Sequence, residues 1–189
     1  IELTELYIEH KKAGYSKEKF LREASHIKGI YVPSLYDVDY NADGTISRFE
    51  PKYPDVPEKV QKRIIEDMDK APYPEKFIVP FIQTVQDRIT LEVYRGCIRG
   101  CRFCQAGAVF RPVREKSPEV LCEQARKLAD NTGYGEMTLS SLSISDYSCI
   151  SQLTDMLLEW TNDRKISLSL PSLRVDSFTK ELMDKISTV

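Results

Sequence analysis

Alternating strand and helix patterns over the second part of the chain constrain its fold most. Short apolar runs typical of strands are followed there by longer amphipathic stretches typical of helices. The predicted strands cover residues 90–94, 136–142 and 165–170, and the predicted helices cover 117–131, 149–160 and a third stretch that Ser177 caps. This spacing favours an α/β fold with a parallel sheet and right-handed crossovers, either a barrel or part of one. Polar loops at the carboxyl ends of such strands are the expected place for chemistry.

The first 76 residues have a different pattern. We predict two short helices separated by Gly14, with Ser16 as the N-cap of the second, then a hairpin whose turn is 41–44, then a helix over 57–71. A proline-rich linker over 72–76 marks the domain boundary. The expected domains are 1–76, an N-terminal α+β region with its linker, and 77–189, the alternating region. The histidines, His10 and His26, are expected to be surface or packing residues.

Composition excludes several classes of protein. The 189 residues include 27 basic and 29 acidic residues, and this balance favours neither nucleic acid nor membrane surfaces. No apolar run is long enough to cross a bilayer, and the first residues lack a signal-peptide pattern, so we expect a cytoplasmic location with reduced thiols. Because the chain starts without methionine and ends inside a predicted helix, we expect it to be a fragment of a longer protein.

Three of the five cysteines lie within eight positions, directly after the first predicted strand. Cys97, Cys101 and Cys104 have the spacing C-x3-C-x2-C, and thiolates are soft ligands that can converge on one metal centre. Disulfides would require an oxidising compartment, and structural zinc would require a fourth ligand for which no Cys-x-x-His spacing exists. Three thiolates without a clear fourth ligand favour a cubane iron-sulfur cluster with one open iron.

This loop resembles the cluster loop of the radical S-adenosylmethionine (radical SAM) superfamily. The shared features are the cysteine spacing, the aromatic Phe103 just before the last cysteine, the preceding strand and the following helix. The resemblance covers residues 77–189, which would form the N-terminal part of a radical SAM core, a partial (β/α) TIM-type barrel. The pattern is most similar to uncharacterised cobalamin-binding-type (B12-binding-type) and methylthiotransferase-like members. No D-x-H-x-x-G motif is present, so cobalamin use is not supported within this chain.

The resemblance implies cofactors and site residues. It implies a 4Fe-4S cluster bound by Cys97, Cys101 and Cys104, and S-adenosylmethionine bound at its open iron. Further cofactor-binding candidates are Phe103 beside the adenine, Ser140 and Ser141 at the place of the family's glycine-glycine-glutamate motif, and Arg174 near the ribose and carboxylate. The alternatives are a Phe103 that only shields the cluster, solvent-facing serines at a strand end, and an Arg174 ion pair with Asp176 or Glu181. An arginine belt near the loop would offset cluster charge or meet an anionic substrate; it consists of Arg95, Arg99, Arg102, Arg111 and Arg114.

The function implied is reductive cleavage of S-adenosylmethionine to a 5'-deoxyadenosyl radical that acts on an unknown substrate, either RNA or a small molecule. An electron donor such as flavodoxin or ferredoxin would be the partner. No substrate-specific catalytic residue is identified, and the fragment alone is expected to be inactive. The alternatives are an iron-sulfur electron-transfer or metal-binding module without S-adenosylmethionine chemistry, and a zinc-stabilised RNA-binding domain.

Overall fold

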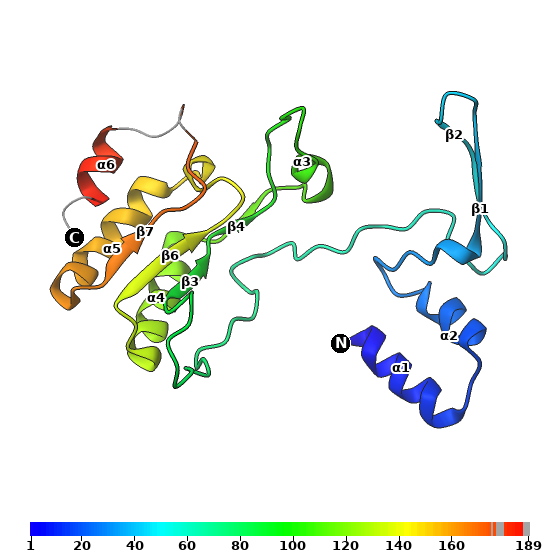
Figure 1. Cartoon of the computed structure of the whole chain (residues 1–189), viewed down its shortest axis with the longest axis horizontal. Helices are drawn as coiled ribbons and strands as arrows, with labels where there is room; N and C mark the ends of the chain where they lie inside the picture. Colours follow the sequence, from blue (N-terminus) through cyan, green and yellow to red (C-terminus); the bar gives the residue numbers. More distant parts are fainter. Residues whose placement is uncertain (175, 177–179, 187–189) are drawn as a thin grey trace. The chain divides into compact units, whose positions relative to one another are not determined.

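The computed structural model describes residues 1–174, 176 and 180–186. The chain divides into two compact units, Ile1–Ile64 and Ile65–Val189, which we call the N-terminal and C-terminal units (Figure 1). The predicted domain boundary before residue 77 stays a prediction.

Two short helices open the N-terminal unit, as the sequence predicts. Helix α1 (Glu2–Ala13) ends at Gly14, whose left-handed conformation (φ 68°) closes the last turn. Helix α2 (Lys17–Ala24) begins at Ser16, whose side-chain oxygen accepts a hydrogen bond from the Lys19 backbone N–H at 3.2 Å.

A β-hairpin follows and also confirms the sequence analysis. After the short helix η1 (Pro33–Leu35), strand β1 (Tyr36–Tyr40) pairs antiparallel with β2 (Ile46–Pro51). The turn between them places Gly44 at φ 82°, a conformation that glycine adopts without strain. Four buried residues form the core of this unit, namely Val32, Leu35, Tyr36 and Val56.

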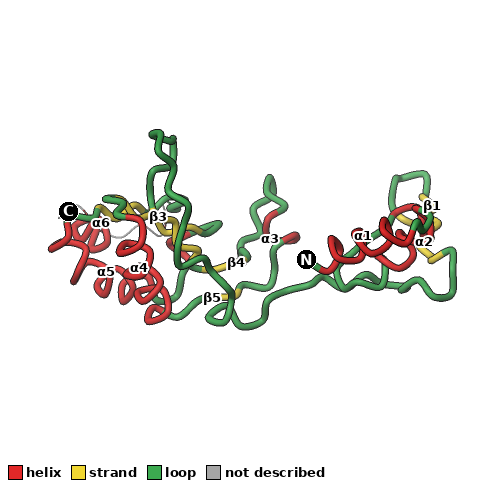
Figure 2. The backbone as a smooth tube through the Cα atoms, turned by 90° about the horizontal axis from the view of Figure 1, so that it is seen from below, coloured by secondary structure: helices red, strands yellow, loops and turns green. Residues whose placement is uncertain are grey.

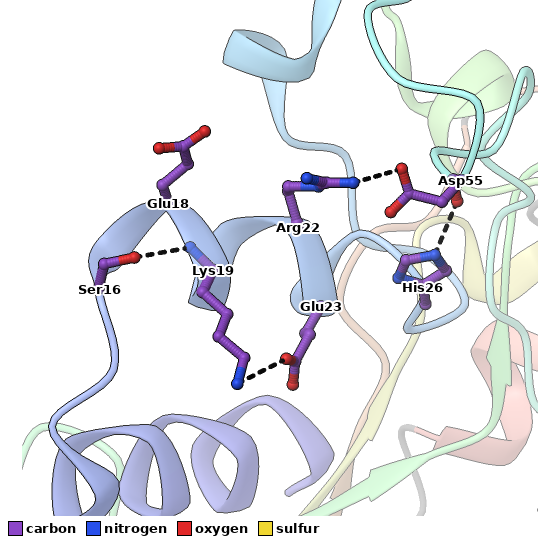
Figure 3. A pocket seen from close by; sticks show the side chains of 7 residues that line it. All are labelled: Ser16, Glu18, Lys19, Arg22, Glu23, His26 and Asp55. Carbon is purple, nitrogen blue, oxygen red and sulfur yellow. Dashed lines mark hydrogen bonds and ion pairs between the residues drawn. The ribbon is translucent and has the colours of Figure 1, made fainter.

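A small charged pocket lies on the N-terminal unit (Figure 3). Four of its charged side chains form two pairs: Arg22 contacts Asp55 at 2.6 Å, and Lys19 contacts Glu23 at 3.8 Å. The histidines also hydrogen-bond within this unit. The His26 ring contacts the Asp55 carbonyl oxygen, and the buried His10 ring contacts Glu23, both at 2.7 Å.

The predicted helix over 57–71 is wrong, because this segment has no helical hydrogen bonding. Val60 and Ile64, expected to face inward, are partly exposed, whereas Val56 and Met68 are buried as separate anchors in different units. An amphipathic helix depends on packing its apolar face against one core. Without that surface, the tertiary anchoring of Val56 and Met68 outweighs the local helix propensity.

A three-stranded parallel sheet forms the centre of the C-terminal unit. The strands are β3 (Ile89–Glu92), β6 (Glu136–Ser140) and β7 (Ser167–Ser169), in the order β3-β6-β7. Both pairings are parallel, which confirms the parallel sheet expected from the alternating pattern. The mixed α/β class is thus observed, while closure into a partial barrel stays a prediction.

Helices α4 (Pro118–Thr132) and α5 (Ile150–Arg164) pack together on one face of this sheet (Figures 1 and 2). Ser117 caps α4 by accepting a hydrogen bond from the Val120 N–H at 3.4 Å, and Gly133 ends it at φ 71°, as predicted. Helix α5 runs beyond its predicted end because Thr161 is also buried. Helix α6 (Lys180–Ile186) follows, while the predicted cap Ser177 lies outside the described residues.

The two faces of the sheet differ in chemistry. Leu91, Leu139 and Leu168 are buried in the core formed with the helices. The alternate positions Thr90, Thr138 and Ser169 are in register across all three strands. Because successive residues of a strand point to opposite faces, this hydroxyl row lies on the face away from the helices. A parallel sheet packed by helices on both faces would be apolar at these positions as well.

An apolar loop over residues 77–85 has no regular secondary structure. Ile78, Phe81 and Val85 are almost fully exposed. The segment before the loop is fixed to α4, since Glu75 contacts Lys127 at 2.8 Å. The segment after it is fixed to β6, since Arg88 contacts Glu136 at 2.6 Å. Within the described residues, no helix has the length and apolarity that a membrane span requires.

Candidate metal centre

The cysteine loop leaves the sheet at the carboxyl end of β3. The Val93 N–H still donates to the Ser140 carbonyl at 2.9 Å, after which the chain forms strand β4 (Tyr94–Arg95). Strand β4 pairs antiparallel with β5 (Arg114–Glu115), so residues 96–113 form a closed loop above this short ladder. The loop includes the short helix α3 (Ala106–Val109) and projects from the sheet in Figure 1.

Two glycines allow close backbone approaches within the loop. Gly96 has φ 100°, and a Cβ added there would lie 2.6 Å from the Pro112 carbonyl oxygen. A Cβ on Gly107 would lie 2.3 Å from the Arg99 carbonyl oxygen. Real Cβ atoms do not approach backbone oxygens this closely, so the observed loop conformation requires glycine at both positions.

An arginine holds the first part of the loop. The Arg111 guanidinium donates to the carbonyl oxygens of Cys97, Ile98 and Arg99 at 3.4, 3.1 and 3.4 Å. These hydrogen bonds fix the backbone that leads from the first cysteine towards the second. A planar guanidinium with several N–H groups is suited to binding several carbonyls at once.

All five cysteines are free thiols. Cys97 and Cys101 are partly exposed, Cys104 is exposed, and the Cys104 sulfur accepts the Ala106 N–H at 3.4 Å. Among the described residues, no three Cys, His, Asp or Glu side chains are gathered closely enough to hold a metal ion. The donor set nevertheless fits an iron-sulfur cluster, since three accessible soft thiols share one loop and a backbone N–H already donates to one sulfur.

The other predicted cofactor residues lie on or beside the loops at this edge of the sheet. Phe103, in the cysteine loop, is 93% exposed. Ser140 ends β6, and Ser141 follows it. The Ser141 hydroxyl is buried and, among the described residues, makes no hydrogen bond of good geometry. It nevertheless lies close enough to the Tyr94 hydroxyl to lower the pKa of Tyr94, an effect that burial of Tyr94 outweighs. Arg174, after β7, contacts Asp176 through its Nε at 3.0 Å, so the ion pair considered as an alternative is present.

Two contacts join the loops that follow β3, β6 and β7. Arg99 of the cysteine loop makes a two-pronged contact with Asp146, and its Nε lies 3.0 Å from one carboxylate oxygen. Asp146 belongs to the short helix η2 (Ile144–Asp146) between β6 and α5. The neighbouring Ser145 hydroxyl accepts the Arg174 backbone N–H at 3.2 Å. The loops after β3, β6 and β7 are therefore connected to one another.

Sequence analysis did not identify Asp146. The only available signal was its place in the polar loop after a strand of a parallel sheet, where functional side chains gather. The hydrogen bond from Arg99 holds the pKa of Asp146 below its usual value, and burial of the carboxylate opposes this effect. Glu92, at the end of β3, was also missed, and its pKa is likewise lowered by the hydrogen bond from Arg95.

The arginine belt is mostly engaged with the protein itself. Arg95 pairs with Glu92 at 2.6 Å, and Arg114 donates to the Pro112 carbonyl at 3.0 Å. Arg99 and Arg111 make the loop contacts given above. Arg102 is exposed and, within the described part of the chain, makes no hydrogen bond or ion pair. Most of the belt therefore stabilises the loop.

The fold and site together define a class: an α/β protein that presents three free thiols at the carboxyl edge of a parallel sheet. Comparison with known protein families makes this specific, because residues 91–188 match the model of the radical SAM superfamily. The chain belongs to this superfamily. Its domain indicates radical chemistry dependent on S-adenosylmethionine, and proteins of the superfamily generally use an iron-sulfur cluster and a reductant.

A relative was found in the archaeon Methanocaldococcus jannaschii. It is an uncharacterised protein, 30% identical to this chain over 138 residues. The match covers 68% of this chain and only 30% of the relative's length. This chain therefore spans less than a third of the length of the relative that it matches.

Proposed function

We propose that the chain contributes the cluster-binding part of a radical SAM enzyme, with Cys97, Cys101 and Cys104 as the ligands of a 4Fe-4S cluster. The observation that supports this most is that three free thiols share one loop at the carboxyl edge of the sheet, inside the segment that matches the family. When bound by these cysteines, such a cluster would supply the one electron needed for reductive cleavage of S-adenosylmethionine to methionine and a 5'-deoxyadenosyl radical. The substrate of that radical is not identified.

The proposed cofactor contacts come from the three connected loops. Phe103, being exposed, offers an aromatic face to the adenine. The Ser141 hydroxyl is buried without a well-formed hydrogen bond, and Ser140 lies beside it at the strand end, so both offer polar groups to the cofactor's amino acid portion. Arg174 would release Asp176 and bind the carboxylate of the cofactor instead. A planar guanidinium binds either carboxylate through two N–H groups.

The architecture proposed for the whole protein is a (β/α) barrel to which this chain contributes three strands. The hydroxyl row of Thr90, Thr138 and Ser169 supports this, because it gives the helix-free face the polarity of a ligand-containing interior. The resemblance to cobalamin-binding-type and methylthiotransferase-like members belongs to the same proposal. An electron donor such as flavodoxin or ferredoxin is the proposed partner.

The test is anaerobic reconstitution with iron and sulfide, followed by electron paramagnetic resonance of the reduced protein with and without S-adenosylmethionine. We expect a cubane signal that changes when S-adenosylmethionine is added and is lost in Cys101→Ala. The matched control is Cys122→Ala, because Cys122 is a buried thiol of α4. A cluster that forms but does not respond to S-adenosylmethionine would contradict the proposal and favour an electron-transfer module.

A further inference from the structure

The contact between Arg99 and Asp146 joins positions 47 residues apart in the sequence. The Asp146 side chain is only 8% exposed, whereas the Arg99 side chain reaches it from the cysteine loop. Both carboxylate oxygens accept a hydrogen bond from the guanidinium. Two parallel charge-assisted hydrogen bonds fix both the orientation and the separation of the two groups.

The Arg99 backbone is held as firmly as its side chain. Its carbonyl oxygen accepts a hydrogen bond from Arg111 at 3.4 Å. The same oxygen faces Gly107 at a distance that no other residue type would allow. Arg99 lies midway between Cys97 and Cys101, so its position determines the path of the chain between these cysteines.

Asp146 is fixed from the opposite side. Helix η2 follows the buried strand β6, and the Asp146 N–H donates to the Ser143 carbonyl at 2.9 Å. Tyr147, the next residue, is buried and donates from its hydroxyl to the Lys116 carbonyl at 2.7 Å. Ser145 connects the same short segment to the loop that carries Arg174. The carboxylate is therefore a rigid point to which the cysteine loop can be attached.

We propose that Asp146 is a positioning residue that, through Arg99, sets the cysteine loop against the carboxyl edge of the sheet. This inference rests on the proposed function for its catalytic meaning, since the loop carries the proposed cluster ligands. Asp146 is not itself a proposed ligand of the cluster. Its role is to limit the conformations of the segment between Cys97 and Cys101 in the cluster-free protein. Less conformational entropy is then lost when the cluster binds.

The first measurement is hydrogen exchange of the cluster-free protein, which does not depend on the proposed function. In Asp146→Asn we expect the loop amides that donate hydrogen bonds, those of residues 104, 106 and 108–110, to exchange about tenfold to a hundredfold faster, as loss of a charge-assisted hydrogen bond predicts. Amides of α4 and β6 should keep their rates. The matched control is Asp130→Asn, which removes the exposed Arg164–Asp130 pair between α4 and α5.

A double-variant cycle separates a specific pair from a general effect. Arg99→Gln should reproduce the exchange pattern of Asp146→Asn, and the double variant should exchange no faster than either single variant. The proposal would be overturned by unchanged exchange of these hydrogen-bonded loop amides, by additive effects of the two substitutions, or by acceleration spread over the whole C-terminal unit. Thermal unfolding followed in parallel shows whether the variants remain folded.

The second measurement relates the pair to the proposed cluster. After reconstitution, we expect Asp146→Asn to lose iron to a chelator several-fold faster than the wild type, with Asp130→Asn unchanged. Equal rates of iron loss in Asp146→Asn and the wild type would overturn the positioning role. If the wild type binds no cluster, the proposed function fails, while the exchange data still decide whether Asp146 orders the loop.

Discussion

Replacing Gly96 with alanine tests whether the cysteine loop depends on a close backbone approach. The new Cβ would lie 2.6 Å from the Pro112 oxygen, 2.8 Å from the Phe110 oxygen and 2.9 Å from the Val113 Cα. All three are backbone atoms, so the clash can be relieved only if the backbone of residues 110–113 moves. The positive φ of 100° adds about 1–2 kcal/mol of strain, and overpacking typically adds about 1–3 kcal/mol. We expect the free energy of unfolding to fall by about 2–5 kcal/mol.

The assay is denaturant unfolding followed by the fluorescence of Trp160. It is the only tryptophan of the chain and is buried in the core of the C-terminal unit, so it reports on that unit. Two glycines provide controls in the same unit. Gly133 also has positive φ but open space around it, and Gly100 has open space and no positive φ. We expect a loss of about 1 kcal/mol for Gly133→Ala and almost no change for Gly100→Ala. Equal losses in Gly96→Ala and Gly133→Ala would refute the close-approach argument.

Three further predictions use the same fluorescence assay. Leu139→Ala, at a fully buried position of the central strand, should lower the free energy of unfolding by about 2–5 kcal/mol, and a loss below 1 kcal/mol would contradict the assigned core. Ser117→Ala, which removes the cap of α4, should cost about 1 kcal/mol, while a helix unaffected by the change would show the cap to be unimportant. Burial lowers the pKa of Lys116, so the charged ammonium group destabilises the folded state at neutral pH. This cost disappears as the pH rises towards the pKa of lysine in the unfolded chain, about 10. The difference in stability between Lys116→Met and the wild type should therefore change between pH 7 and pH 10, and a constant difference would refute the assignment.

The order of the elements in the C-terminal unit follows from local sequence signals. Ser117 and Gly133 define the ends of α4 because capping depends on nearby residues, and the alternation of Leu91, Leu139 and Leu168 with polar residues indicates the strand faces. The predicted helix over 57–71 is wrong because apolar periodicity does not show whether a core is present against which the apolar face could pack. The segment has separate anchors instead of one continuous buried face.

The sequence locates the cysteine loop, whereas the roles of its residues in binding a cluster or cofactor stay predictions. The cysteine spacing is a local pattern, and the free thiols lie where strand order places them. The contact between Arg99 and Asp146 could not be predicted, because it joins distant positions whose approach depends on tertiary structure. The arginines near the cysteines were expected to offset cluster charge or to meet an anionic substrate, whereas Arg95 and Arg99 are paired with carboxylates of the protein. Sequence gives the density of charge near a site but not which charges neutralise each other.

The apolar loop over residues 77–85 makes the covalent chain accessible to a protease without exposing the sheet. Phe81 is fully exposed and is a suitable cleavage point for chymotrypsin. The chain before the loop stays attached to the C-terminal unit: Met68 is buried, the Asp69 carboxylate accepts the Ser117 N–H at 2.7 Å, and Glu75 pairs with Lys127. The loop therefore offers a site for inserting a reporter or creating new chain ends, since the contacts of Met68, Asp69 and Glu75 lie outside it.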